Sequence, residues 1–192
     1  MLTRRAFWYL RHGETNWNAE GKSQGNVDVP LNARGEAQAH EAAAALLGRG
    51  IRSIVSSPMR RARDTAAIIA KVLGLVVGEE ADLREVAFGA KEGQPMGPWY
   101  EAWLAGAVTP PGAETFEALR TRAAAALNRA LERTPPVLVV AHGSIFRALR
   151  AEMGLPVTTR TPNGLPLLCE PGNNPGEPWR LTALTGDLSA AT

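Results

Sequence analysis

The sequence predicts an α/β fold of three layers, in which a mostly parallel central sheet carries helices on both faces. Two observations predict it. Short apolar runs typical of buried strands alternate with longer segments whose apolar residues recur at helical spacing. Glycines and prolines separate many of these segments. Strands that alternate with helices favour a parallel sheet, because each helix returns the chain to the end of the sheet where the next strand begins.

The first half of the chain supplies two strands and two helices in alternation. An apolar run predicts a strand at about residues 5–10, and a polar loop rich in Gly, Asn and Pro follows at 18–30. An Ala-rich helix then extends to about residue 47, with Asn32 as its cap. A second buried strand is expected at 51–56. Pro58 then starts another helix, because proline is favoured in a first helical turn.

The second half repeats the alternation after an irregular stretch. Gly74 ends the second helix, and a short third strand is expected directly after it. Residues 81–112 are irregular, apart from a short helix near 99–104. Further patterns predict a helix at about 114–133, a strand at 137–141, a helix at 144–153, and strands at 165–169 and 179–184 around a Pro/Gly/Asn turn.

Length and composition narrow the class of protein. The 192 residues fit one domain, which we expect to span residues 1–192. A net charge of +2 gives no reason to expect a nucleic-acid partner, and the single cysteine excludes an internal disulfide framework. No apolar stretch approaches the roughly 20 residues of a membrane span, and the first apolar run is too short for a signal peptide. We therefore expect a cytoplasmic protein without a membrane partner.

Two His-Gly turns follow buried-strand patterns. Arg11-His12-Gly13 comes directly after the first strand, and His142-Gly143 comes directly after the strand at 137–141. In open α/β sheets, ligands bind at the carboxyl ends of the strands, and glycine lets the backbone approach a ligand closely. Two imidazoles and a guanidinium at such ends indicate a site for an anionic substrate, with phosphate as the expected anion.

Four sequence blocks carry a more specific signal together than any of them does alone. They are residues 11–18, 56–66, 83–93 and 140–144. Together they resemble the histidine phosphatase superfamily, which includes cofactor-dependent phosphoglycerate mutases and acid phosphatases. The resemblance covers about residues 6–150 and implies a phosphoglycerate mutase-like fold. Residues 111–115 are similar to the family's Pro-Gly-Gly-Glu-Ser segment, from which Ala113 departs.

The resemblance implies that His12 is the nucleophile and forms a phosphohistidine. A neutral imidazole nitrogen can attack phosphorus and divide one difficult displacement into two easier ones. His142 is expected across the phosphoryl group from Arg11. Arg11 and Arg61 suit the phosphoryl oxygens, because a guanidinium offers a planar fork of donors. Arg61 is preferred over Arg60, since its spacing to the Thr and Ala that follow matches the family.

Two further positions match the family's substrate site, and a third is expected to contribute from its place at a helix start. Asn18 matches an asparagine that contacts phosphate, and the backbone N–H of Gly143 is expected to donate at a helix start. Glu85 matches the general acid that protonates the leaving alkoxide. Without the other blocks, an exposed salt bridge between Glu85 and Arg84 would be the simpler interpretation.

The resemblance implies a short substrate cap at about residues 86–112. Its aromatic residues Trp99, Tyr100 and Trp103 have helical spacing, which is more typical of core packing than of a ligand cage. Two distant histidines without an acidic cluster make a poor metal site, and no dinucleotide or Walker-type loop is present, so we expect neither metal nor cofactor.

The favoured function is a phosphomonoesterase that acts on a small phosphorylated metabolite. The first alternative is a cofactor-dependent phosphoglycerate mutase, but the interval from Glu85 to His142 is shorter than the enclosing segment of the family's mutases. A short cap favours water as the final phosphoryl acceptor. A second alternative is a non-catalytic module that binds a phospho-ligand or a protein, although the full set of motif residues argues against it. A protein phosphohistidine phosphatase is a further alternative, but those chains are smaller and lack the Leu-Arg-Glu block. The sequence specifies neither the oligomeric state nor the substrate.

Overall fold

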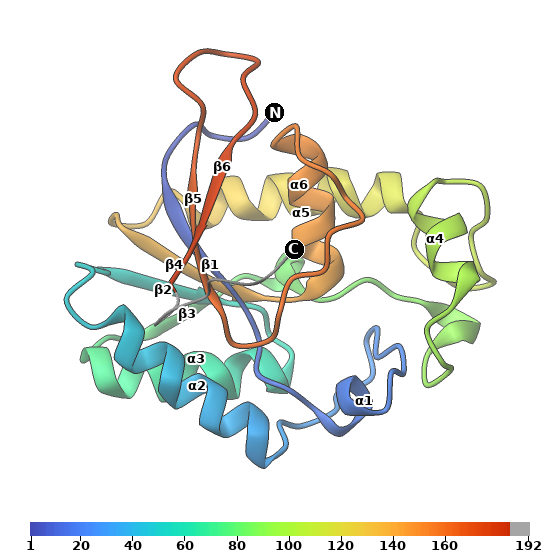
Figure 1. The fold of residues 1–192 in the computed structure, drawn as a ribbon, viewed down its shortest axis with the longest axis horizontal. Helices are drawn as coiled ribbons and strands as arrows, with labels where there is room; N and C mark the ends of the chain where they lie inside the picture. The colour runs from blue at the N-terminus through green and yellow to red at the C-terminus, as the bar shows by residue number, and fades with distance from the viewer. Residues whose placement is uncertain (185–192) are drawn as a thin grey trace.

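A six-stranded sheet forms the middle of the molecule (Figure 1). The computed structural model describes residues 1–184. The strand order is β3-β2-β4-β1-β5-β6. The strands are β1 (Phe7–Arg11), β2 (Ser53–Ser56), β3 (Val77–Glu79), β4 (Val137–Ala141), β5 (Pro166–Glu170) and β6 (Arg180–Ala183). The helices are α1 (Asn16–Ala19), α2 (Ala33–Leu46), α3 (Arg60–Leu73), α4 (Pro98–Leu104), α5 (Phe116–Ala130) and α6 (Gly143–Glu152), with short 3₁₀ turns η1 (Ala81–Leu83) and η2 (Gly89–Lys91).

The sheet is parallel over its first four strands and antiparallel at one edge. β3, β2, β4 and β1 run in the same direction, whereas β5 pairs antiparallel with both β1 and β6. β1 and β4 are neighbours, with Arg11 opposite Ala141 at their carboxyl ends. The residues that follow these two strands therefore leave the sheet side by side.

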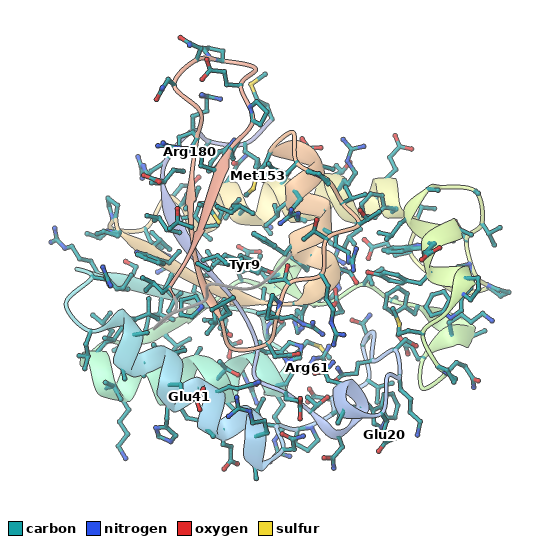
Figure 2. The ribbon with its side chains drawn as sticks, in the orientation of Figure 1. Tyr9, Glu20, Glu41, Arg61, Met153 and Arg180 are labelled. Atoms are coloured by element: carbon teal, nitrogen blue, oxygen red, sulfur yellow. The ribbon has the colours of Figure 1, made fainter. Side chains whose placement is uncertain are left out.

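Alternating residues of the central strands point to opposite faces of the sheet. Tyr9 and Val139 pack on one face with the buried sides of α5 and α6. Leu10 and Val140 pack on the other face with α2 and α3. Figure 2 shows Tyr9 well inside the molecule. The predicted three-layer α/β fold, with helices on both faces, is confirmed.

Several boundaries differ from the sequence expectation. α3 begins at Arg60, so the prediction that Pro58 starts this helix is wrong. Met59 is the cap residue, and the Asp28 carboxylate accepts the backbone N–H of Arg60 at 2.8 Å. The third strand begins at Val77 instead of residue 75, because Leu75 N–H still bonds back to Ala70 O at the end of the helix. The predicted cap Asn32 is confirmed, since its side chain accepts from Gly35 N–H at 2.8 Å.

The segment at 86–112 lies at one side of the sheet (Figure 1) and contains η2 and α4. Trp103 is fully buried, and its indole N–H donates to Glu114 O at 2.8 Å. Phe88 packs edge-on against Trp99, Tyr100 and Trp103 at ring-centroid distances of 5.3–5.7 Å. These aromatic residues belong to, or pack against, the same buried cluster as residues of α5 and α6, so they pack as core residues, as their helical spacing indicated.

Candidate active site

His12 and His142 meet at the carboxyl ends of β1 and β4. The backbone N–H of His12 donates to Ala141 O at 3.0 Å and extends the pairing of the two strands by one residue. The two imidazole rings lie 5.2 Å apart, centroid to centroid. The strand register thus brings together two histidines that are 130 residues apart in the sequence.

His12 is buried and carries its lone pair on Nε2. Its Nδ1 lies 2.7 Å from Gly13 O, and because a carbonyl can only accept, Nδ1 must hold the proton of the neutral ring. Burial lowers the pKa of His12 well below its usual 6.5, and the charges of Arg61 and Arg11 lower it further. At neutral pH the ring is therefore uncharged, with Nε2 available as a nucleophile or acceptor.

Close backbone packing fixes the turn that carries His12. A Cβ on Gly13 would lie 2.3 Å from Gly35 O, and one on Gly35 would lie 2.1 Å from Glu14 O. Only glycine fits at either contact. The Gly13 N–H donates to the Thr65 hydroxyl at 3.0 Å, which ties the turn to α3. Glu14 accepts from the side chain of Asn32 at 3.0 Å, so its role in this structure is to hold the loop against α2.

His142 is held from two sides. The hydroxyl of Tyr9 bonds to both the carbonyl and the N–H of His142, at 2.8 and 3.1 Å. The Ser57 hydroxyl lies 2.7 Å from Nε2 and accepts from Met59 N–H at 3.2 Å, so we assign the hydroxyl proton to the bond with His142. Nδ1 then carries the ring proton, and it is buried without a partner among residues 1–184. Burial, Arg61 and His12 lower the pKa of His142 well below 6.5, so it is a neutral donor.

This geometry predicts that Ser57 is a positioning residue for His142. We expect Ser57→Ala to lower kcat/KM for an aryl phosphate about tenfold, the effect of losing one buried hydrogen bond of roughly 1–3 kcal/mol. Ser57→Thr keeps the hydroxyl and should restore most of the rate. Ser53→Ala is the matched control, because Ser53 lies on β2, which Ser57 directly follows, and bonds to Thr134 O instead. Equal rates for Ser57→Ala and wild type would contradict the assignment.

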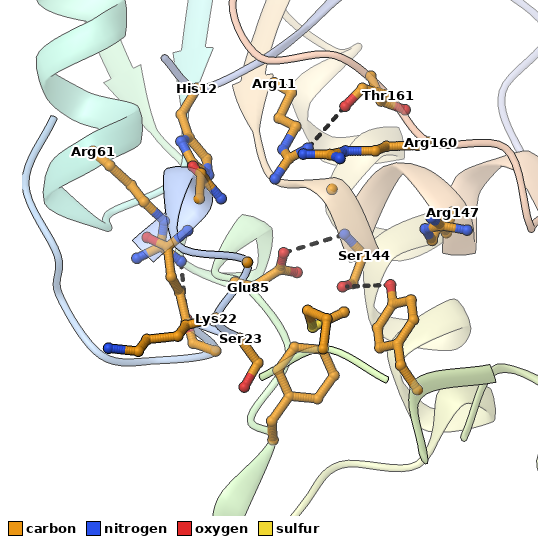
Figure 3. A pocket seen from close by; sticks show the side chains of 18 of the residues that line it. Arg11, His12, Lys22, Ser23, Arg61, Glu85, Ser144, Arg147, Arg160 and Thr161 are labelled. Atoms are coloured by element: carbon orange, nitrogen blue, oxygen red, sulfur yellow. Dashed lines mark hydrogen bonds between the residues drawn. The ribbon is translucent and has the colours of Figure 1, made fainter. Parts of the chain in front are cut away.

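A cavity of about 430 Å³ opens beside His12. Arg11 and Arg61 both line it, from β1 and α3 (Figure 3). Arg61 is fully buried, and its guanidinium donates to Gly25 O and Val27 O, both at 2.9 Å. The Nε atoms of Arg11 and Arg61 are buried without partners among residues 1–184. Arg60, by contrast, pairs with Asp64 on the helix surface.

Glu85 lies in the cavity wall, 7% exposed. One carboxylate oxygen accepts from Val86 N–H at 3.0 Å, and the other accepts from Ser144 N–H at 3.1 Å, at the start of α6. Arg84 pairs with Asp82 at 2.8 Å, so the interpretation of Glu85 as an exposed partner of Arg84 is wrong. Glu85 is thus placed where it can exchange a proton with a ligand.

The remaining predicted positions also line the cavity, with one exception. Asn18 lines the cavity, and its side-chain oxygen Oδ1 accepts from Asn163 Nδ2 at 3.2 Å. Gly143 lines it as well, and a Cβ there would approach Arg11 Nε to 3.3 Å. His142 is the exception: it is not among the lining residues, although its ring centre is 5.2 Å from that of His12.

Several residues of the cavity wall were not predicted. They include Ser144 and Arg147 on α6, and Arg160 and Thr161 on the loop that follows it. Tyr100 is the one aromatic residue of α4 in the described lining, whereas Trp99 and Trp103 are not part of it. Arg122, also not predicted, donates to the carbonyls of Asp82 and Arg84 and to the Glu114 carboxylate, and so holds the segment before Glu85.

None of the described helices is both long and apolar enough to cross a membrane. The described residues contain no group of three or more His, Cys, Asp or Glu side chains placed to share a metal ion.

The family model of the histidine phosphatase superfamily (branch 1) matches residues 7–165. The chain belongs to this superfamily. The predicted resemblance is confirmed. The match extends past the four blocks to residue 165, directly before β5. The relatives described next align with about three quarters of the chain.

Two relatives and one solved structure illustrate the likeness. The "Uncharacterized phosphatase PhoE" of Bacillus subtilis (strain 168) is 38% identical over 146 residues, 75% of each chain. The "Probable phosphoglycerate mutase GpmB" of Yersinia enterocolitica is 38% identical over 160 residues, 77% of this chain and 74% of that protein. The structure of a mycobacterial glucosyl-3-phosphoglycerate phosphatase is 29% identical, with a TM-score of 0.79, over 93% of this chain and 97% of that chain. The predicted enzyme class, a phosphatase with a mutase as the alternative, agrees with these names.

Proposed function

We propose that this protein hydrolyses phosphate monoesters through a phosphohistidine formed on His12. The observation that carries the proposal is the state of His12: a neutral ring whose Nδ1 is committed to Gly13 O, leaving Nε2 at the cavity beside Arg11 and Arg61. A binding module would gain nothing from an unprotonated nitrogen among arginines. A nucleophile for phosphorus needs that nitrogen.

In the first step Nε2 of His12 attacks phosphorus, and the bond from phosphorus to the alcohol oxygen breaks. Arg11, Arg61, Asn18 and the Nδ1–H of His142 stabilise the charge on the phosphoryl oxygens, which is the main requirement of phosphoryl transfer. Glu85 gives its proton to the departing alkoxide. In the second step Glu85 takes a proton from water, the water oxygen bonds to phosphorus, and the N–P bond breaks to release phosphate.

The carboxyl of Glu85 suits the acid role by its position. Its two oxygens are fixed by the Val86 and Ser144 N–H groups, so the side chain cannot turn away. The Nδ1–H of His12 is committed to Gly13 O, and we assign the Nδ1–H of His142 to the phosphoryl oxygens, so Glu85 is the acid that the site offers to the alkoxide.

The short cap distinguishes hydrolysis from isomerisation. Residues 86–112 contribute Phe88, Met96 and Tyr100 to the cavity wall. We propose that this cap leaves the phosphohistidine open to water, within one domain that needs no metal and works in the cytoplasm. The mutase alternative requires the opposite, exclusion of water while the phosphoryl group returns to glycerate.

Product analysis with 3-phosphoglycerate tests the proposal. With EDTA present throughout, we expect free phosphate to appear no more slowly than 2-phosphoglycerate, with or without added 2,3-bisphosphoglycerate. Isomerisation much faster than hydrolysis, and dependent on the bisphosphate, would establish the mutase. Binding of phosphate without turnover of any ester would establish the non-catalytic module.

Glu85→Gln is expected to lower kcat most for esters whose leaving alcohol needs a proton in order to depart. An alkyl phosphate such as 3-phosphoglycerate should lose about 100-fold or more in kcat, in the range of general acid catalysis, whereas p-nitrophenyl phosphate should lose far less because its phenolate leaves unaided. The measurement is kcat for both esters with the same preparation. Equal losses for the two esters would remove Glu85 from the acid role.

A further inference from the structure

The cavity holds more positive charge than one phosphate monoester needs. Arg11, Arg61, Arg147 and Arg160 line it, and among the described lining residues Glu85 alone carries a carboxylate. None of the four arginines forms an ion pair with a carboxylate of residues 1–184. A phosphate monoester brings up to about two negative charges at neutral pH. Arg11 and Arg61 balance these charges, and two guanidinium groups remain.

The two remaining guanidinium groups belong to Arg147 and Arg160. In the view of Figure 3, His12 and Arg61 lie on one side of the cavity and Arg147 lies on the other, beyond Glu85, while the Arg160 side chain reaches toward Arg11. Lys22, the other basic residue of the lining, is paired with Glu20 at 2.6 Å. Because the leaving alcohol of an in-line transfer departs opposite the attacking Nε2 of His12, we expect the alcohol part to extend toward Arg147 and Arg160.

Arg147 is held in place before any ligand binds. Its Nη1 donates to Val157 O at 2.6 Å, and its guanidinium lies 5.4 Å from the centre of the Tyr100 ring. The Tyr100 hydroxyl in turn bonds to the Ser144 hydroxyl at 3.2 Å. One of the five donors of Arg147 is thus used for anchoring, and a fixed guanidinium loses little freedom when it binds an anion.

Arg160 and Thr161 complete the same wall. The backbone carbonyl of Thr161 accepts from Arg11 at 2.9 Å, which fixes the loop beside β1. Burial, with a contribution from the Arg160 charge, lowers the pKa of Arg11 to about 10, so Arg11 stays cationic at neutral pH beside a second cation. The Thr161 side chain is 4% exposed, and its hydroxyl has no partner among residues 1–184. Like charges and an unsatisfied hydroxyl at one wall both favour a bound anion.

We propose that Arg147, Arg160 and the Thr161 hydroxyl form a second anion subsite, which selects phosphate monoesters whose alcohol part carries another anionic group. That group is a carboxylate or a second phosphate. The inference rests on the proposed function, since it places the scissile phosphate at His12. A cavity of about 430 Å³ restricts the substrate to a small metabolite.

A matched set of esters tests the subsite. 3-Phosphoglycerate and glycerol 1-phosphate share a carbon skeleton and differ only in a carboxylate against a hydroxymethyl group. Glycerol 1,3-bisphosphate offers a second phosphate instead. We expect kcat/KM for at least one doubly anionic ester to exceed that for glycerol 1-phosphate at least about tenfold, as for one charge-assisted hydrogen bond. The preferred ester shows whether the second anion is a carboxylate or a phosphate.

Variants assign that preference to residues. In Arg147→Gln/Arg160→Gln, and to a smaller extent in Arg160→Gln alone, the ratio between doubly and singly anionic esters should fall toward one. Arg150→Gln is the matched control, because Arg150 also anchors this loop, through Pro156 O at 2.7 Å, but does not line the cavity. It should keep the wild-type ratio.

The outcomes separate this inference from the proposed function. Turnover of p-nitrophenyl phosphate with no preference among the glycerol esters would overturn the subsite and leave the phosphatase proposal standing. A preference that persists in the double variant would also overturn it. Failure to hydrolyse any ester, p-nitrophenyl phosphate included, would overturn the proposed function and the subsite with it.

Discussion

Alanine in place of His12 is expected to lower kcat/KM for p-nitrophenyl phosphate at least about 10,000-fold, because loss of a nucleophile removes the covalent route itself. Charge stabilisation by Arg11 and Arg61 cannot compensate, since guanidinium groups supply no nucleophile in place of the lost Nε2. Water would have to attack from solution, without the alignment that the buried ring provides.

The fold should survive this substitution. The substitution removes the bond from the imidazole to Gly13 O, but the bond from Gly13 N–H to Thr65 and the close packing of Gly13 on Gly35 remain, so far-ultraviolet circular dichroism should match wild type and unfolding should remain cooperative. His40→Ala, on the exposed side of α2, is the matched control and should keep wild-type activity. Substantial turnover by a folded His12→Ala protein would contradict the phosphohistidine mechanism.

Arg61→Ala is expected to show the second largest effect, a loss of about 3 kcal/mol or more in transition-state stabilisation, equivalent to about 150-fold in kcat/KM. Arg61 lines the cavity, and its side chain also holds the loop carbonyls of Gly25 and Val27. The neighbouring substitution Arg60→Ala should change kcat/KM far less, because Arg60 faces solvent and pairs with Asp64.

A third variant separates charge from loop anchoring. Arg61→Lys keeps a positive charge but lacks the fork of donors, so it should recover only part of the lost rate. Thermal unfolding of all three variants shows how much of each loss is structural. A larger effect for Arg60→Ala than for Arg61→Ala would mean that the phosphate-binding arginine has been assigned one residue away from its true position.

The positions of the motif residues could be predicted because they depend on local features. A buried-strand pattern followed by His-Gly places an imidazole at a strand end, and the two strands that carry His12 and His142 are both interior in the sheet. The parallel pairing of β1 with β4 then follows from the α/β alternation. Arg61 is preferred over Arg60 because its spacing to Thr65 and Ala66 matches the family, and the burial of Arg61 agrees with that choice.

Other features depend on contacts between distant segments and leave no local pattern. The carboxylate of Asp28, 32 residues earlier in the chain, accepts the backbone N–H of Arg60 at the start of α3. Pro58 therefore predicted the start of this helix two residues too early. The bonds of Ser57 and Tyr9 to His142 join three strands. A serine or tyrosine in a buried strand carries no sign of its partner.

The second anion subsite illustrates the same limit. Arg147 lies within an amphipathic helix, where the sequence alone makes it one more charged residue on the polar side. Arg160 and Thr161 belong to an irregular loop whose path is set by contacts such as that between Arg11 and the Thr161 carbonyl. Their convergence on the cavity could be found only from the structure.

The most direct test of the mechanism is to trap the phosphoenzyme. Wild-type protein is mixed with ³²P-labelled ester, quenched in alkali within the first turnovers, digested, and its labelled peptide sequenced. The account predicts one labelled peptide, containing His12, whose label is stable in alkali and lost in acid, and no label in His12→Ala. An acid-stable label on a serine or threonine, or a label on His142, would contradict it.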